Sequence, residues 1–512
     1  MLVLALWACG GPDPAVDVVD DPPPAGVESC IAAAPPVVPL RRLSQREMAA
    51  SGRDLTGVDI DVWSRVPLDA LVLGFDNSAY RGNVSLLEAD AYMRSSEDLA
   101  AQVDLASILP CTPTGADDEV CARSFVETFG RRAWRRPLDP VEADALVALW
   151  HVGADAESFE SGAELVLQAM FQSPEYLYRV RAGDGYDRAA DLAYFVWGST
   201  PDDALLDAAD AGELATEDGV RATVDRMILD PRARDQVGRF VELWMGTSGL
   251  PDITREDPGW TPELADALLE ETRRFTATVA FDDGGTLGDL LTRAGTVADG
   301  AVAGLYGVDG PVDWAWIELD PAQRSGLLTQ GSVLALYAHE NQTSPVHRGK
   351  LVREQLLCHT LPPPPGELDI SLPPVDPDMS TRERFARHSQ DPMCSGCHVL
   401  MDPIGFGFER YDSIGRWREL EGNGVPVEST GYVTASSLDA PFDGVPELAA
   451  ILAADPMVGA CLETQLFRYA RGREETSDEA CFLDVAGPAA LTTPVVDLFR
   501  EAAVTAALEV AP

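Results

Sequence analysis

The chain has 512 residues, 46% of them hydrophobic and 24% charged, which is the composition of a globular protein and not of a disordered one. Its 84 acidic and 38 basic residues leave a net charge of −46, which repels polyanions and argues against binding to nucleic acid. No apolar run approaches the roughly 20 residues that a membrane-spanning helix needs.

The N-terminal residues predict an export signal followed by a tether. Residues 1–8 are apolar and precede Cys9, as at the end of a bacterial lipoprotein signal, so we expect residues 1–9 to be a signal remnant and Cys9 to be lipidated. The alternative is a buried N-terminal strand with a free thiol. Residues 10–39 hold eight prolines, five acids and no base, which predicts a disordered tether to a membrane surface.

Helix signals dominate the body of the chain. Residues that cap helix N-termini occur at Ser44–Glu47, Asp139–Glu142, Thr200–Asp203 and Asp230–Pro231. In several of these segments the cap is followed by a proline or by an acidic residue three positions later, which strengthens the signal. Alternating strand-like runs are few and short. We therefore expect a mainly α protein, with several small helical domains in tandem and few short strands.

Breaks in this pattern predict the domain boundaries. We expect helical domains at residues 40–110, 111–182 and 183–312, a domain at 313–435 that contains the motif described below, and a C-terminal helical domain at 436–512.

A helix predicted over Cys121–Trp134 has a basic side that continues just past it, with Arg131, Arg132, Arg135 and Arg136. Four neighbouring arginines are suited to binding an acidic partner. In so acidic a chain, however, we favour ion pairs with neighbouring helices.

The segment Cys394–His398 has the pattern of covalent haem c attachment, which adds a c-type cytochrome-like segment to the predicted mainly α fold. Its two thiols lie one helical turn apart, where they can add to the haem vinyl groups, and His398 follows directly to bind iron. A disulfide between Cys394 and Cys397, a zinc site and coincidence are the alternatives. Zinc needs four ligands, and the nearest further Cys/His pair is Cys358 with His359.

Five of the six histidines fall within 60 residues, at His339, His347, His359, His388 and His398. If His398 is the proximal iron ligand, a pure electron carrier needs a second ligand on the opposite face of the haem, whereas an open position suits peroxidase or oxygen chemistry. His347, His388 and Met457 are the distal candidates, and the sequence leaves the choice open. Met401 follows His398 too closely to reach that face.

Two flanking segments are candidates for contact with the cofactor. The glycines and aromatic residues of Met401–Asp412 suit a flat apolar group, although such spacing more often marks a core. The prolines between residues 361 and 377 predict a stiff, extended strap that closes over one haem edge.

The remaining cysteines fit an oxidising compartment. Cys111 and Cys121 enclose a short polar loop, and Cys461 and Cys481 enclose a helical hairpin, so we expect a local disulfide in each. This leaves Cys30 and Cys358 as a further pair.

Several motifs together identify a family resemblance. They are Leu40–Glu47, Arg53–Leu55, Gly74–Asn77, Phe129–Leu138, Gln172–Arg179, Tyr194–Gly198, Thr343–Lys350 and the haem motif with Met401–Pro403. Over roughly residues 40 to 505 the chain resembles the bacterial exported multi-domain family of domain of unknown function fifteen-ninety-two, found in planctomycetes and myxobacteria and associated with cytochrome c. The resemblance implies an exported, lipid-anchored helical protein with haem residues at Cys394, Cys397 and His398, and it implies no particular reaction.

Three functions follow as hypotheses. The first is a mono-haem c-type electron carrier in the periplasm or outer cell envelope, held by its lipid anchor, with another exported redox protein as partner. The second is a haem peroxidase or oxygenase that acts on an extracellular substrate. The third is an envelope scaffold or binding protein without haem, in which Cys394 and Cys397 form a disulfide.

Overall fold

The computed structural model describes residues 40–58, 62–78, 84–179, 183–361, 376, 378–388 and 392–508, with the backbone alone at 387–388 and 392–394. Within these ranges the protein is mainly helical, as expected. Its strands form antiparallel two-stranded sheets: β1 (Arg41–Arg42) with β2 (Tyr178–Arg179), β3 (Gly295–Ala298) with β4 (Ala315–Glu318), and β5 (Thr430–Val433) with β6 (Ala440–Asp443).

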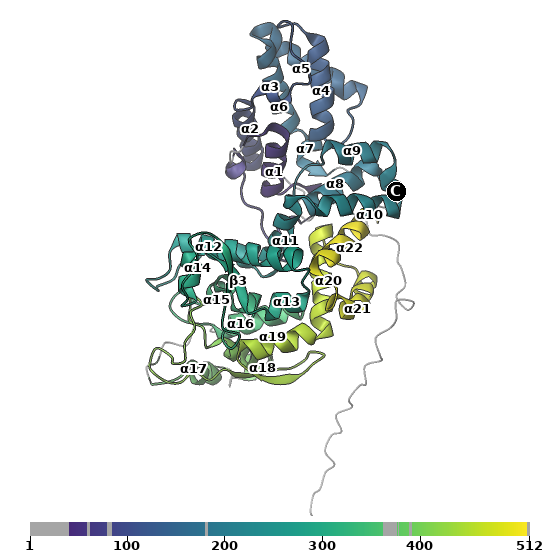
Figure 1. Ribbon diagram of the computed structural model, residues 1–512. Coiled ribbons are helices and arrows are strands. Elements are labelled where there is room, and N and C mark those ends of the chain that lie inside the picture. Colours follow the sequence, from purple (N-terminus) through teal and green to yellow (C-terminus); the bar gives the residue numbers. More distant parts are fainter. Residues whose placement is uncertain are drawn as a thin grey trace, which may run out of the picture.

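The N-terminal helices form the elongated upper part of the molecule in Figure 1. They are α1 (Gln45–Thr56), α2 (Leu86–Ala100), α3 (Leu105–Ile108), α4 (Glu119–Ala133), α5 (Pro140–Ala156), α6 (Phe159–Gln172) and α7 (Pro174–Leu177), with a 3-10 turn η2 (Val62–Arg65). One apolar core, from Leu43 to Tyr194, joins them and includes the fully buried Trp150 and Phe171.

The middle of the chain crosses from this upper part to the lower one. Its elements are α8 (Gly185–Val196), α9 (Asp203–Asp210), η3 (Glu213–Ala215), α10 (Glu217–Ile228), α11 (Pro231–Trp244), η4 (Thr247–Asp252), α12 (Pro262–Ala277), the π-helical turn η5 (Thr278–Asp282), α13 (Leu287–Thr292) and α14 (Gly300–Leu305). Helix α11 lies at the junction of the two parts (Figure 1).

The last third of the chain completes the lower part. It contains η6 (Leu327–Thr329), α15 (Gly331–Leu336), α16 (Pro345–Leu351) with a continuing π-helical turn η7 (Val352–Leu356), α17 (Thr381–His388), α18 (Pro392–Gly405), η8 (Phe406–Phe408), α19 (Val445–Ala454), α20 (Pro456–Arg471), α21 (Ser477–Ala490) and α22 (Val495–Leu508). A second core runs from Phe75 through α8 and α11 to α22, and a smaller one surrounds α12 and α14.

These cores are shared across the predicted domain boundaries. Residues on both sides of position 110 contribute to the first core, and the second core draws on the three predicted domains that follow residue 182. The division into five helical domains therefore stays a prediction.

The local helix signals are mostly confirmed. Capping boxes form at Ser44 and at Asp139, and Asp230 caps α11 ahead of Pro231. Thr200 was expected to cap a helix but does not. Asp202 caps α9 instead, because the Thr200 hydroxyl donates to the carbonyl of Arg132 at 2.9 Å.

Among the described helices, none is by itself long and apolar enough to cross a membrane. Helices α19 and α20 together have the length and composition of a membrane span, but they are bent by 76° where they meet. The predicted tether at 10–39 with Cys9 and Cys30, and nearly all of the proline strap, lie outside the described residues.

Candidate cofactor site

Helix α18 carries the haem attachment pattern. The helix begins at Pro392, and proline is favoured in a first turn because its missing N–H has no intrahelical partner there. Because the helix continues through the motif, Cys394 and Cys397 lie one helical turn apart, and His398 follows directly. The predicted local geometry of the motif is present in the backbone.

One face of α18 is tightly closed against α16. A Cβ at Gly349 would overlap the carbonyl oxygen of Met401, and one at Gly405 would overlap that of Pro345, so the two helices run antiparallel at backbone contact. Met401 and Ile404 are buried on this side. The close approach fixes how α18 is oriented in the protein.

The other face of α18 is open. Cys397 is half-buried with a free thiol, Gly396 and Val399 are exposed, and a Cβ placed on Gly396 would meet nothing within 4 Å. This turn offers the space and the thiol that covalent attachment of a flat apolar group requires.

Asp402 orients the imidazole of His398. The Nδ1–H of His398 donates to the carboxylate of Asp402, at 2.9 Å from Oδ1 and 3.1 Å from Oδ2. This hydrogen bond raises the pKa of His398. A histidine that donates one ring N–H to a carboxylate is typical of metal ligation through the other nitrogen. Sequence reasoning missed Asp402, although its spacing of four residues from His398 on a helix was a usable signal.

Two buried arginines hold the surroundings of α18, and sequence reasoning gave neither a role. Arg353 donates to the carbonyl of Leu400 at 2.8 Å and to Thr434 Oγ1 at 3.0 Å. Arg348 donates to four backbone carbonyls, including those of Phe408 and Tyr411 at 3.0 Å. Burial lowers the pKa of Arg353 and that of Arg348, the latter to about 10. Both side chains tie α16 and η7 to the chain around and after the motif.

The aromatic residues after the motif belong to the protein core. Ile404, Phe408 and Tyr411 are almost fully buried in the large second core. Their spacing therefore reflects packing in the protein core, which the sequence analysis gave as the more common meaning of such a pattern.

The structure does not bring the described distal candidates to His398. Pro345 and Gly349 face α18, and His347 lies about 200° around α16 from Pro345, so it points away from α18. Its ring instead lies 4.8 Å from that of His339. Met457 lies in the first turn of α20 and packs against the large core. The backbone of His388 ends α17, and its side chain lies outside the described atoms.

The cysteines pair partly as expected. The Cys111–Cys121 disulfide is present. The predicted pairing of Cys461 with Cys481 is wrong, as is that of Cys30 with Cys358, because Cys358 is bonded to Cys461. Cys481 is also disulfide-bonded, to a partner outside the described side chains.

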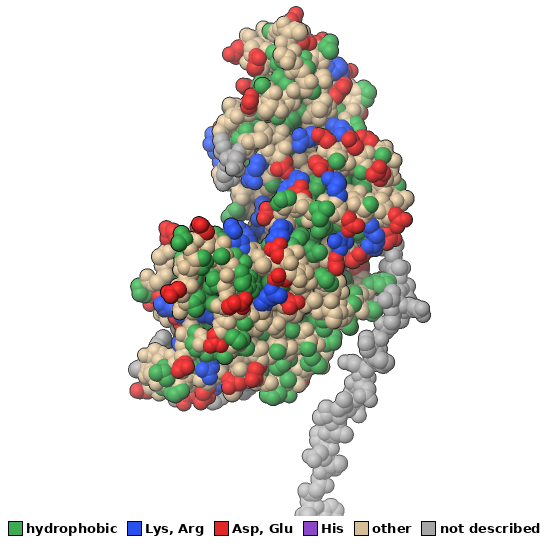
Figure 2. Space-filling view, in the orientation of Figure 1, with side chains coloured by type: hydrophobic (Ala, Val, Ile, Leu, Met, Phe, Trp, Pro, Cys, Tyr) green, Lys and Arg blue, Asp and Glu red, His purple; other side chains and the backbone are tan. Residues whose placement is uncertain are grey.

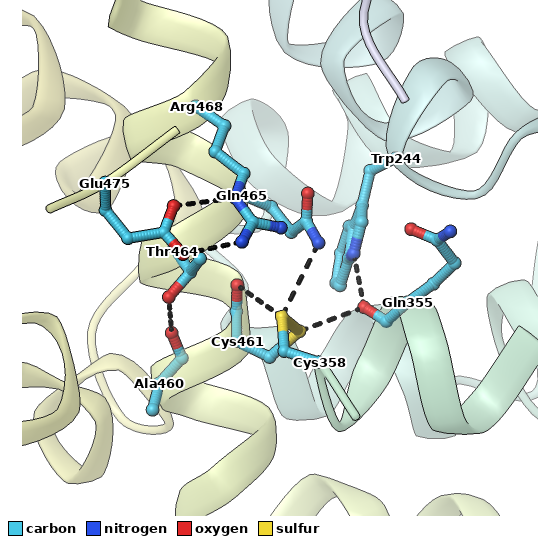
Figure 3. The surroundings of a disulfide bond; sticks show 9 residues. All are labelled: Trp244, Gln355, Cys358, Ala460, Cys461, Thr464, Gln465, Arg468 and Glu475. Carbon is cyan, nitrogen blue, oxygen red and sulfur yellow. Dashed lines mark hydrogen bonds and ion pairs between the residues drawn. A yellow bond between two sulfur atoms is a disulfide. The ribbon is translucent and has the colours of Figure 1, made fainter. Parts of the chain in front are cut away.

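The Cys358–Cys461 disulfide joins the end of η7 to α20 (Figure 3). The Gln355 carbonyl lies 3.3 Å from the sulfur of Cys461 and accepts from Trp244 Nε1 at 2.6 Å. Because the bond closes a loop between residues 103 apart, loop-closure entropy alone predicts a stabilisation of about 4–5 kcal/mol. It fastens the chain that leads into the motif to the C-terminal helices.

The arginine cluster at the C-terminal end of α4 makes internal contacts, as favoured above. Arg131 pairs with Asp207 at 2.8 Å and Arg136 pairs with Glu142 at 2.7 Å. Arg135 is buried and donates to backbone carbonyls, among them that of Tyr178 at 2.7 Å. These contacts are the ion pairs with neighbouring helices that the acidic composition favoured.

Within the described residues there is no group of three or more His, Cys, Asp or Glu side chains placed to hold a metal ion by themselves. A porphyrin supplies four nitrogen ligands to its iron and His398 would supply a fifth, so the free thiol of Cys397 and the oriented imidazole fit the proximal side of a haem c site.

Comparison with protein families identifies the chain. It matches proteins of unknown function described as PSD3 (DUF1587) at residues 41–104, PSD5 (DUF1595) at 121–180, PSD4 (DUF1592) at 184–308 and PSCyt3 (DUF1588) at 324–421. These are planctomycete domains associated with cytochrome c, and the resemblance to the DUF1592 family is thereby confirmed. The PSCyt3 match contains the whole Cys394–His398 motif. No curated protein and no solved structure matches the chain.

Proposed function

We propose that the chain is a mono-haem c-type protein of the cell envelope that carries electrons to or from another exported protein. Haem c is held through Cys394, Cys397 and His398. The observation that carries this proposal is the free thiol of Cys397 on the open turn of α18. The other cysteine side chains that the structure describes are all in disulfides.

The chain's own residues prepare this turn for the group. The closed contact with α16 holds α18 in place, and Asp402 fixes the tautomer and direction of the His398 ring. When bound, the haem supplies reversible one-electron chemistry at its iron.

The proposed location rests on separate features. Disulfides such as Cys111–Cys121 form and persist outside the reducing cytoplasm, and covalent haem attachment fits the same compartment. Cys9, after an apolar leader, supports lipid anchoring to the envelope. Replacing Cys9 by Ser should move the protein from the membrane fraction to the soluble one.

A pyridine haemochrome assay tests the cofactor. The full chain is expressed in the periplasm together with haem c maturation proteins, and we expect one haem for each chain. Cys397→Ser should weaken attachment, and His398→Ala should keep the thioether links but change the ligand spectrum. His151→Ala is the matched control, because His151 is a solvent-accessible histidine paired with Glu119 far from the motif. A colourless matured wild type overturns the proposal and favours the scaffold.

Binding of small ligands to the iron distinguishes carrier from enzyme. A carrier needs a second axial ligand, which neither His347 nor Met457 supplies at His398, so this ligand would come from another residue. Iron with both axial positions filled resists carbon monoxide in the reduced state and cyanide in the oxidised state. Rapid binding of both would overturn electron carriage as the main role and favour a peroxidase or oxygenase.

A further inference from the structure

Two histidines outside the proposed haem site lie against each other. His339 follows α15 and His347 is on α16, and their ring centres are 4.8 Å apart with the ring planes at 52°. This angle lies between the stacked and the edge-to-face arrangements that ring pairs prefer. The pair is therefore not a typical ring-packing contact.

The backbone around both histidines is fixed by hydrogen bonds. The N–H of His339 donates to the carbonyl of Gln342 at 2.9 Å, and the side chain of Gln342 accepts from Arg384 at 2.8 Å. The N–H of His347 donates to Ser344 Oγ at 3.2 Å at the start of α16. Because α16 is also in backbone contact with α18, a rigid frame presents both rings.

The ring nitrogens of both histidines are available to a ligand. Within the described part of the chain, neither ring shares a hydrogen bond with another group. His347 is exposed and His339 is half-buried. Burial lowers the pKa of His339 to about 4, and the pKa of His347 is lowered by the protein around part of its ring and by the charge of Lys350. Both rings are therefore neutral near pH 7, which is the form that binds metals.

The spacing of the two rings suits a single metal ion between them. Imidazole nitrogens bind zinc at about 2.0–2.1 Å, so two rings in neighbouring positions on one ion have centres roughly 4.5–5.2 Å apart. The observed 4.8 Å lies within this range. Since His347 is exposed, its ring can turn a nitrogen toward the ion, and water can fill the positions that the protein leaves open.

The charges around the pair favour a metal that prefers nitrogen over one held by charge alone. Arg255 and Arg348 lie near His339. Lys350 lies near His347. These cations oppose a hard ion such as magnesium, which also prefers oxygen ligands. From a distance, however, the net charge of −46 attracts cations, and acidic side chains lie over both parts of the molecule on the face that Figure 2 shows.

We propose that His339 and His347 together bind one divalent transition-metal ion, zinc or copper, with water as the remaining ligands. Imidazole suits both metals, and copper should bind more tightly because nitrogen sites follow that order. His347 is on the side of α16 that faces away from α18, so this site is separate from the proposed haem site and does not depend on it.

Isothermal titration calorimetry on the full chain tests the proposal, with zinc chloride as the probe and magnesium chloride as its oxygen-preferring counterpart. Cys394→Ser with Cys397→Ser serves as the background protein, because thiolates themselves bind zinc. We expect zinc to bind one site far more tightly than magnesium binds. The absence of zinc binding, or equal binding of the two ions, overturns the proposal.

Variants of the two histidines decide whether the site is the right one. His339→Ala and His347→Ala should each weaken zinc binding at least tenfold, because even the hydrogen-bond partners of metal ligands are worth about 10–100-fold in affinity. His151→Ala is the matched control, since His151 is an accessible histidine paired with Glu119. Equal affinity in the background protein and in either variant of the pair contradicts the proposal.

Copper and thermal unfolding give readouts that a structural role of the histidines would not move. At one copper(II) per chain, the electron paramagnetic resonance spectrum should show coupling to two nitrogen atoms, and to one after His347→Ala. Because His347 is exposed, His347→Ala should unfold at the temperature of the background protein in EDTA, and zinc should stabilise only the background protein. Unchanged nitrogen coupling, or equal stabilisation by zinc, would mean that the pair is not the metal site.

Discussion

Helices α4 and α18 carry similar side chains, but those of α4 are bonded within the protein and the thiol of Cys397 on α18 is free. Both carry a cysteine near the N-terminal end and functional groups further along. On α4 the thiol of Cys121 is in a disulfide with Cys111, and Arg131 is ion-paired to Asp207. On α18 the thiol of Cys397 is free on an open turn, and His398 is oriented by Asp402.

The difference shows where function is to be sought in this chain. Reactive residue types are abundant in both helices, so their presence does not separate a structural region from a functional one. What separates them is whether the bonding capacity of each group is used within the protein. The thiol of Cys397 on α18 is a group whose bonding capacity is unused.

The largest expected effect, on haem content and on stability, comes from replacing each of two cysteine pairs by serine. Cys394→Ser with Cys397→Ser should abolish covalent haem and leave the free energy of unfolding of the haem-free protein nearly unchanged. Cys111→Ser with Cys121→Ser should keep the haem and cost roughly 2–3 kcal/mol, because the bond closes a loop between residues only 10 apart. Haemochrome content and urea unfolding measure both effects. Equal loss of stability in the two double variants would contradict the comparison.

A buried carboxylate in the protein core should make the free energy of unfolding change with pH by roughly 3 kcal/mol. Glu271 on α12 accepts hydrogen bonds from Tyr306 at 2.7 Å and from Thr296 at 2.9 Å, and burial raises its pKa to about 7. The folded state then binds a proton more tightly than the unfolded state. Its contribution to stability is full below the unfolded pKa and is lost as pH rises through about 7.

The variant Glu271→Gln isolates this contribution. It removes the titration, so the difference in unfolding free energy between variant and wild type should shift in favour of the variant from about pH 5 to about pH 8. Urea unfolding across that range measures the difference. A pH-independent difference would mean that Glu271 keeps an ordinary pKa.

Two glycines test the closed and open faces of α18. Gly349→Ala should cost about 1–3 kcal/mol, since the new Cβ overlaps the carbonyl of Met401 and the helices must separate. Gly396→Ala should be neutral or stabilising by up to about 1 kcal/mol, because its Cβ meets nothing and alanine is the better helix former. Thermal unfolding of the haem-free proteins measures both. A tolerated Gly349→Ala would mean that the two faces are equally open.

Local features of the fold could be predicted from the sequence because they depend on neighbouring residues. The capping boxes at Ser44 and Asp139, the turn of helix that spaces Cys394 from Cys397, and the short Cys111–Cys121 loop are all of this kind. Each depends on backbone geometry over a few positions.

Features that depend on distant parts of the chain could not be predicted. Cys461 pairs with Cys358, 103 positions away, and not with the nearer Cys481, because η7 packs against α20. The position of His347 in the chain made it a candidate iron ligand. In the fold, however, α16 contacts α18 through Gly349, on the side of α16 opposite to His347.

The smallest expected effect is on the reduction potential, and it rests on the haem proposal. The carboxylate of Asp402 increases the electron-donating strength of the His398 ring through the Nδ1 hydrogen bond, which stabilises oxidised iron over reduced iron. Asp402→Asn retains a weaker acceptor, so we expect haem to attach normally and the potential to rise by tens of millivolts in a redox titration. Glu428→Gln removes an exposed carboxylate paired with Arg382 and controls for the change of net charge alone. If both variants shift the potential equally, Asp402 acts only by its charge and does not orient the ligand.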